Sequence, residues 1–174
     1  LGDGGDSEES QASDQDDVLF DALLTVMLRL VFLLYAEDSG LLPTDSPLYE
    51  KHYSLYALYK RLEDERGAHA EAMTRRYSAW PGLLALFRVV YLGASHGELK
   101  LPARDGHLFD PHRFPFLEGF EADARAVPLS AADHEARAAA QVPTVDDETV
   151  FQVLRSLIML KSKGSSVGAR LSYR

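Results

Sequence analysis

The sequence predicts a mainly α-helical fold, an irregular helical bundle with a Pro/Gly-rich loop segment and room for one short β-hairpin. Apolar residues recur at spacings of three and four in several separate stretches, as they do along the buried face of a helix. Glycine and proline fall between these stretches, where helices end. With 174 residues, 46% of them hydrophobic, the chain is long enough to bury the core of one compact domain.

The first residues differ from the rest in composition. Leu1–Gln15 is rich in Gly, Ser, Asp and Glu and has no aromatic residue, so it buries too little apolar area to offset the entropy of ordering. We therefore expect a flexible acidic linker over residues 1–17 and a helical connector domain over residues 18–174. The linker carries −7 of the net charge of −9, which leaves the remainder close to neutral at −2.

The first predicted helix spans Val18–Glu37, with Asp16 or Asp17 as its N-cap. Apolar residues occupy both of its faces, a pattern typical of a central helix that is buried all round. Gly40 is expected to end the helix, and Pro43 prevents its continuation.

Further elements follow from the same signals. Thr44–Tyr53 is expected to be a polar loop, and Ser54–Arg66 a second helix, with a weak interruption at Gly67. Ala68–Tyr77 is alanine-rich and charged, which favours a solvated helix. A fourth helix begins at Trp80-Pro81 and ends at Gly93.

The segment Ala94–Glu118 is punctuated by proline and glycine, which predicts irregular structure with a short β-hairpin around Leu99–Leu108. Its large apolar side chains are expected to anchor it to the helical body; they are Phe109, Phe114, Phe116 and Leu117.

The last part of the chain alternates between charge and apolar spacing. Glu121–Val142 is expected to be mobile, although Ser130–Ala140 has helical character. A helix over Thr149–Leu160 follows, capped by Thr144 or Asp146. We expect a turn at Lys161–Gly168, and a new element after it.

Two clusters could carry metal chemistry. His107, Asp110 and His112, with His96 nearby, offer metal-binding side chains, but a loop gives no spacing that makes them converge. Glu98-Leu99-Lys100 matches half of a magnesium-nuclease pattern, which also needs an upstream aspartate. The structural alternatives, a loop with diverging side chains and a solvated charged turn, are the better interpretations.

Two further groups have structural and functional interpretations. Glu37 and Asp38 could act as an acid–base pair. Carboxylates at the negative end of a helix need a partner, however, so an ion pair with arginine or the capping of another segment is favoured. The tyrosines could stack on nucleic-acid bases, but packing at a domain interface is favoured; they are Tyr49, Tyr53, Tyr56 and Tyr59.

Nothing in the composition directs the chain to DNA, so a DNA-backbone contact would need a local basic patch. The candidates are Arg75, Arg76, Lys161, Lys163 and Arg170.

The sequence also lacks several signatures. It has no cysteine, hence no disulfide framework, and no glycine-rich phosphate loop or Asn-Pro-Pro-Tyr-type tetrapeptide. We therefore expect no catalytic, cofactor-binding or metal residue in this chain. The polar, acidic start is unlike a signal peptide, and the apolar run Leu30–Leu34 is far shorter than the roughly 20 residues of a membrane span. These features favour the cytoplasm and no membrane association.

A set of colinear segments resembles a known family. The helix ending Tyr35-Ala36-Glu37-Asp38-Ser39-Gly40-Leu41-Leu42-Pro43 resembles a segment of the type IIG-like restriction–modification methyltransferases, which include the methyltransferase of the DISARM phage-defence system. Later matches are Gly106-His107-Leu108-Phe109-Asp110-Pro111 and Phe114-Pro115-Phe116-Leu117, and Leu171–Arg174 resembles the approach to the methyltransferase domain. The similarity covers about Val18–Arg174, and Glu121–Val142 departs from it.

The resemblance implies that the chain is an excerpt from a longer protein, the helical domain that precedes the catalytic domain. That parent would transfer methyl from S-adenosylmethionine to the N6 of adenine in double-stranded DNA after flipping the base, and it could also carry a nuclease. Its partners would be DNA, the remaining domains and other defence-system subunits. The alternative, from the residues, is an adaptor that docks a partner subunit. The residues that carry the resemblance are structural: Tyr35, Glu37, Asp38, Gly40, Pro43, Phe109, Asp110 and Pro111.

Overall fold

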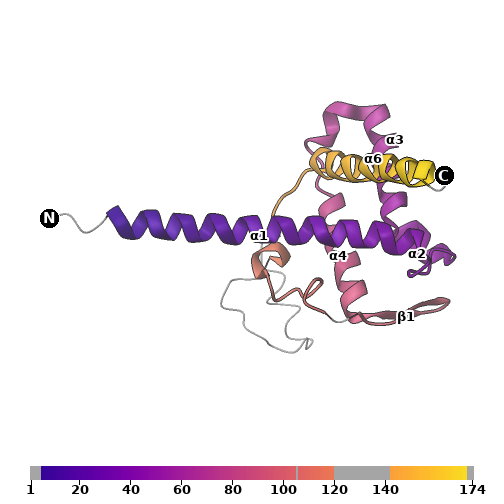
Figure 1. Ribbon diagram of the computed structural model, residues 1–174, viewed down its shortest axis with the longest axis horizontal. Coiled ribbons are helices and arrows are strands. Elements are labelled where there is room, and N and C mark those ends of the chain that lie inside the picture. Colours follow the sequence, from indigo (N-terminus) through magenta and orange to yellow (C-terminus); the bar gives the residue numbers. More distant parts are fainter. Residues whose placement is uncertain (1–4, 105, 120–141, 172–174) are drawn as a thin grey trace.

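The computed structural model is mainly α-helical, with one small antiparallel hairpin among the residues it describes, as the sequence predicts (Figure 1). It describes residues 5–104, 106–119 and 142–171, and side chains between residues 15 and 160 of these ranges. The elements are α1 Gly5–Asp38, α2 Pro47–His52, α3 Leu55–Met73, α4 Ala79–Leu92, β1 Ala94–His96, β2 Leu99–Leu101, the 3₁₀ helix η1 Pro115–Glu118, and α6 Asp147–Leu171.

Helix α1 is the longest element and reaches well beyond the others. The helices α3, α4 and α6 gather around its C-terminal half, while its N-terminal half projects from them (Figure 1). The helix begins at Gly5, inside the region expected to be a flexible linker. Two effects explain the difference: acidic residues are favourable in the first turns of a helix, and extending an existing helix costs less than starting one.

The two faces of α1 have different surroundings. The buried face follows Ala22, Val26, Arg29 and Leu33, at steps of four, three and four. The opposite face is also apolar but lies exposed, so the prediction of a helix buried all round is wrong. The other helices cover one side of α1 and leave a stripe of large side chains bare: Phe20, Leu24, Leu28, Val31 and Tyr35.

The end of α1 confirms the stop predicted at Gly40. Gly40 has a φ of +64°, a conformation that favours glycine, and the Leu41 N–H donates to the Ala36 carbonyl at 2.9 Å. Leu42 then turns into the core, and Pro43 follows it.

The next segments show two differences from expectation. Helix α2 lies within Thr44–Tyr53, which was expected to be a loop; Pro47 suits its first turn and the buried Tyr49 anchors it. Helix α3 runs on as far as Met73. Its backbone irregularity falls at His69, with φ −147° and ψ 57°, and not at Gly67.

The core lies where α1, α3, α4 and α6 meet. Helix α4 contributes Trp80, Leu83, Phe87 and Val90, which gives the predicted helix its buried face. Helix α6 contributes Val150, Phe151 and Leu154.

A glycine sets the geometry between α4 and the hairpin. Gly93 has a φ of +76°, and a Cβ there would lie 2.7 Å from the backbone nitrogen of Ala103, so only glycine fits. The strands pair antiparallel, with Ala94 opposite Leu101 and His96 opposite Leu99. The hairpin therefore lies a few residues before the expected Leu99–Leu108, because its turn forms at Gly97, where φ is +56°.

Helix α6 continues through the turn expected at Lys161–Gly168, and that expectation is wrong. Glycine inside a helix costs about 1 kcal/mol, which the rest of a long helix can offset. The mobility expected for Glu121–Val142, and the helical character of Ser130–Ala140, concern residues that lie outside the described ranges except for Val142.

Candidate functional site at the end of helix α1

The buried carboxylate of Glu37 lies in the last turn of α1 and accepts four hydrogen bonds. Its Oε1 accepts hydrogen bonds from the Leu55 N–H at 2.7 Å and from the Tyr49 hydroxyl at 3.0 Å. Its Oε2 accepts from the Ser54 hydroxyl at 3.2 Å and from the Tyr56 N–H at 3.4 Å. Since the N-terminal N–H groups of a helix have no partner within it, Glu37 caps α3 from a different helix.

The charge of Glu37 acts on the tyrosines around it. Burial, followed by the nearby Glu37 carboxylate, raises the pKa of the Tyr49 hydroxyl far above its ordinary value. Burial and Glu37 also raise the pKa of Tyr56, whose hydroxyl donates to Asp38 at 3.2 Å. Both phenols therefore remain protonated donors. Three roles were considered for Glu37: an acid–base pair, an ion pair with arginine, and the capping of another segment. The hydrogen bonds show the third, since Glu37 caps α3.

The tyrosine-rich stretch contacts the protein itself. Tyr49 is fully buried and packs near Tyr53, with ring centroids 6.3 Å apart. The Tyr59 ring stacks on Phe151 of α6 at 5.6 Å, with only 6° between the planes. Tyr49 and Tyr59 thus pack against other side chains of this protein, as in the packing interpretation.

A second cluster joins α1 to the loop before η1. The buried Arg29 donates from Nε to the Leu108 carbonyl at 2.5 Å, and from an Nη atom to the Asp110 carbonyl at 3.1 Å. Its guanidinium also lies 5.2 Å from the Phe87 ring centroid. Burial lowers the pKa of Arg29, and the nearby Glu118 partly opposes this. The arginine therefore holds a loop about 80 residues away by its backbone.

Aromatic packing completes this loop anchor. The Phe109 ring meets Phe32 of α1 edge-on at 5.5 Å and lies 6.0 Å from Phe87. The expected anchors Phe109, Phe114 and Leu117 are buried, whereas Phe116 is more exposed.

Carboxylates also fix the junction between α4 and α6. The fully buried Asp147 accepts from the Ala79 N–H at 2.8 Å and from the Ser78 hydroxyl at 2.9 Å, so the start of α6 caps α4. Its neighbour Asp146 caps α6, as one of the two predicted caps, through the Thr149 N–H at 2.8 Å. Hydrogen bonds from Thr149 lower the pKa of Asp146.

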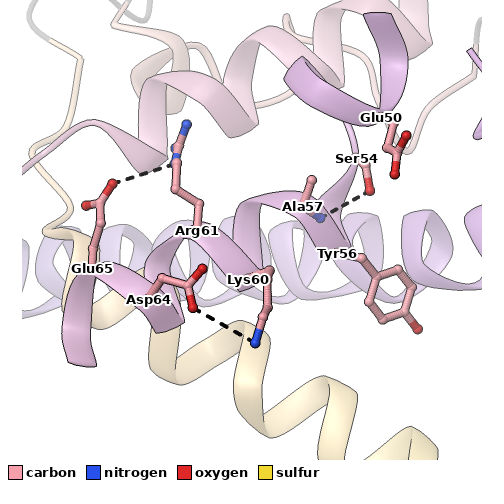
Figure 2. A pocket seen from close by; sticks show the side chains of 8 residues that line it. All are labelled: Glu50, Ser54, Tyr56, Ala57, Lys60, Arg61, Asp64 and Glu65. Atoms are coloured by element: carbon pink, nitrogen blue, oxygen red, sulfur yellow. Dashed lines mark hydrogen bonds and ion pairs between the residues drawn. The ribbon is translucent and has the colours of Figure 1, made fainter. Parts of the chain in front are cut away.

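An open hollow of about 590 Å³ runs along α3 and is lined by charged side chains of both signs (Figure 2). Lys60 approaches Asp64 at 3.9 Å, and Arg61 approaches Glu65 at the same distance. Because these charges offset one another at the surface, the hollow does not present a strong field to a ligand.

The residues considered for metal chemistry do not converge. Among the residues that the structure describes, no three His, Cys, Asp or Glu side chains form a metal-binding group. Asp110 accepts from the His112 N–H at 2.9 Å, an interaction local to the loop. Glu98 and Lys100 lie exposed on the hairpin.

The candidate DNA contacts lie on two elements. Arg75 and Arg76 follow α3; both are exposed, and Arg76 pairs with Glu65 at 3.1 Å. The other three, Lys161, Lys163 and Arg170, belong to α6, and their side chains lie outside the described part.

Helix α1 also meets the length and composition of a membrane span. Within the described residues, Gln15–Asp38 is the one segment long and apolar enough by these measures, and it is partly buried against the other helices. The core helix of a soluble protein has the same length and composition.

Sequence reasoning missed two of these residues. Arg29 is the only basic residue of an otherwise apolar and acidic helix, which is a signal that it is buried and paired. Asp147 gives no comparable signal, because its partners lie 68 and 69 residues away.

Comparison with family models, curated proteins and solved structures finds no match to this chain.

Proposed function

We propose that this chain is a non-catalytic helical connector domain of a bacterial restriction–modification or phage-defence DNA N6-adenine methyltransferase. The parent would be one of the type IIG-like enzymes, which include the methyltransferase of the DISARM system. The connector domain braces the catalytic domain, which binds S-adenosylmethionine, and connects it to other parts of the parent protein. The parent acts on double-stranded DNA in the cytoplasm.

The observation that carries this proposal is that the segments resembling the methyltransferase family make contacts between helices. Glu37 commits both carboxylate oxygens to capping α3, and Gly40 supplies the turn after α1. Phe109 and the Asp110 carbonyl are held by α1, through Phe32 and Arg29. These segments thus connect helices and loops to one another, as expected of a scaffold domain.

The bare apolar side of α1 supports the connecting role. An exposed stripe of large apolar side chains on a helix is a feature of surfaces that contact another protein surface. In a connector, the remaining domains of the parent provide that contact.

Methyl transfer by the complete parent protein tests the proposal. Purified parent should transfer labelled methyl from S-adenosylmethionine to adenine N6 in duplex DNA. Glu98→Ala and Lys100→Ala, which alter the exposed hairpin, should leave its rate unchanged. A complete protein that binds no S-adenosylmethionine, or a rate lost with Lys100→Ala, would refute the connector role.

A second candidate, an adaptor that docks a partner subunit, is favoured by the same exposed stripe. The two differ in their dependence on salt. DNA binding through phosphates weakens steeply as salt rises, whereas association through an apolar surface does not. Salt-sensitive DNA binding by the parent favours the methyltransferase, and salt-insensitive capture of a protein subunit without DNA binding favours the adaptor.

A further inference from the structure

The exposed side of α1 has the spacing of a helix-docking surface. Its large side chains follow one another at steps of four, four, three and four residues, and each is between 48% and 66% exposed. Residues so spaced share one helix face. We call this surface the α1 stripe; it consists of Phe20, Leu24, Leu28, Val31 and Tyr35.

Carboxylates border the α1 stripe. Asp17 lies one turn before Phe20, Asp21 lies beside Leu24, and Asp38 lies one turn after Tyr35. All three residues are exposed. The helix carries nine acidic residues and a single basic one, Arg29, which is buried in the core. The stripe is therefore apolar in its centre and negative at its two ends.

This charge pattern argues against two possible binding partners of the α1 stripe, a second copy of the chain and a lipid surface. Two copies that paired through their stripes would bring carboxylates of one helix beside those of the other, in either orientation, and like charges oppose such pairing. Helices that lie on lipid surfaces carry Lys and Arg around their apolar face, the opposite of what α1 carries.

We propose that the α1 stripe binds an amphipathic helix whose apolar face is flanked by lysine and arginine, supplied by another domain of the parent polypeptide. The partner's apolar side chains pack between the stripe residues as in other helix pairs. Its cations lie beside Asp17 and Asp21, which fixes its position along α1. The source of this helix rests on the proposed function, whereas its chemistry rests on the stripe alone.

Peptide binding to this chain tests the chemistry. The probes are two synthetic helical peptides with the same leucine stripe, one flanked by lysine and the other by glutamate. Fluorescence anisotropy of the labelled peptides gives both dissociation constants. The lysine peptide should bind at least about tenfold more tightly than the glutamate peptide.

Variants locate the binding and its charge preference. Leu28→Gln should weaken binding of the lysine peptide about tenfold, while Leu92→Gln, a control at a side chain of similar exposure on α4, should change it less than about twofold. Asp17→Lys with Asp21→Lys should reverse the preference between the peptides. Circular dichroism checks that each variant keeps its helices.

Three outcomes would overturn the inference. One is equal affinity for both peptides. Another is a dimer of the wild-type chain in sedimentation that Leu28→Gln disperses, which would assign the stripe to a second copy. The third is binding to phosphatidylcholine vesicles that Leu28→Gln abolishes. A parent without a methyltransferase domain would refute the proposed function and the source of the helix, but would leave the peptide preference unchanged.

Discussion

The Glu37 carboxylate, in the last turn of α1, accepts the Leu55 backbone N–H in the first turn of α3 at 2.7 Å. The last turn of one helix thus caps the first turn of another. Asp147 does the same for α4 from the start of α6. Because a negative side chain meets the positive end of a helix at both joints, each contact satisfies a backbone donor and lowers the electrostatic energy.

Removing the Glu37 carboxylate should destabilise the fold strongly. Glu37→Ala leaves the Leu55 N–H and the Tyr49 hydroxyl without their partner in a buried place, at a cost of about 3 kcal/mol. Urea denaturation measures the change in the free energy of unfolding. Glu50→Ala, at an exposed residue of the nearby α2, is the control and should cost less than about 0.5 kcal/mol. Equal effects of the two changes would contradict the capping role.

Tyr49 predicts a loss of stability at alkaline pH. The pKa of its buried hydroxyl is raised in the folded protein, so the folded state keeps a proton that the unfolded chain releases above about pH 10. The free energy of unfolding should therefore fall as pH rises past this value.

Tyr49→Phe isolates that effect. The variant should be less stable near neutral pH by about 1 kcal/mol, since one hydrogen bond to Glu37 is lost. Its stability should then decline less steeply than that of the wild type between about pH 9 and pH 11. Chemical denaturation across this range measures both slopes, and parallel slopes would show that Tyr49 does not cause the decline.

The adjacent residues Asp146 and Asp147 provide a matched comparison. Asp146 is partly exposed and caps its own helix, so Asp146→Ala should cost about 1 kcal/mol. Asp147 is fully buried and binds two donors of another segment, so Asp147→Ala should cost about 2–3 kcal/mol. Thermal unfolding ranks the two variants, and the reverse order would refute the cross-helix cap.

Arg29 should hold the loop before η1 against α1. Lysine cannot donate from two separate nitrogens as the guanidinium does, so Arg29→Lys should lose one carbonyl contact and cost about 2 kcal/mol. Hydrogen exchange should rise selectively in residues 106–119. Arg75→Lys, at an exposed site, should leave the exchange unchanged. A uniform rise across the chain would contradict a local anchor.

Much of the helical architecture follows from short-range sequence signals. The end of α1 at Gly40 and the start of α4 near Trp80-Pro81 depend on glycine and proline, whose backbone preferences act locally. The capping of α6 by Asp146 is equally local.

Other features depend on distant residues and were missed for that reason. Helix α2 is anchored by the hydrogen bond from Tyr49 to Glu37, which lies 12 residues earlier, in α1. Apolar residues on both faces of α1 predicted full burial, yet periodicity does not tell whether other helices cover one face or two. The hydrogen-bond partners of Arg29 and Asp147 lie 79 and 68 residues away in sequence, so only the folded structure identifies them.

The central claim, that this chain connects the parts of a DNA adenine methyltransferase, is tested most directly by the coding sequence that follows Arg174. Translation of that sequence should give a domain that binds S-adenosylmethionine, with an Asn-Pro-Pro-Tyr-type motif in its active site. A stop codon soon after Arg174, or an unrelated domain, would contradict the claim and leave the adaptor as the better account.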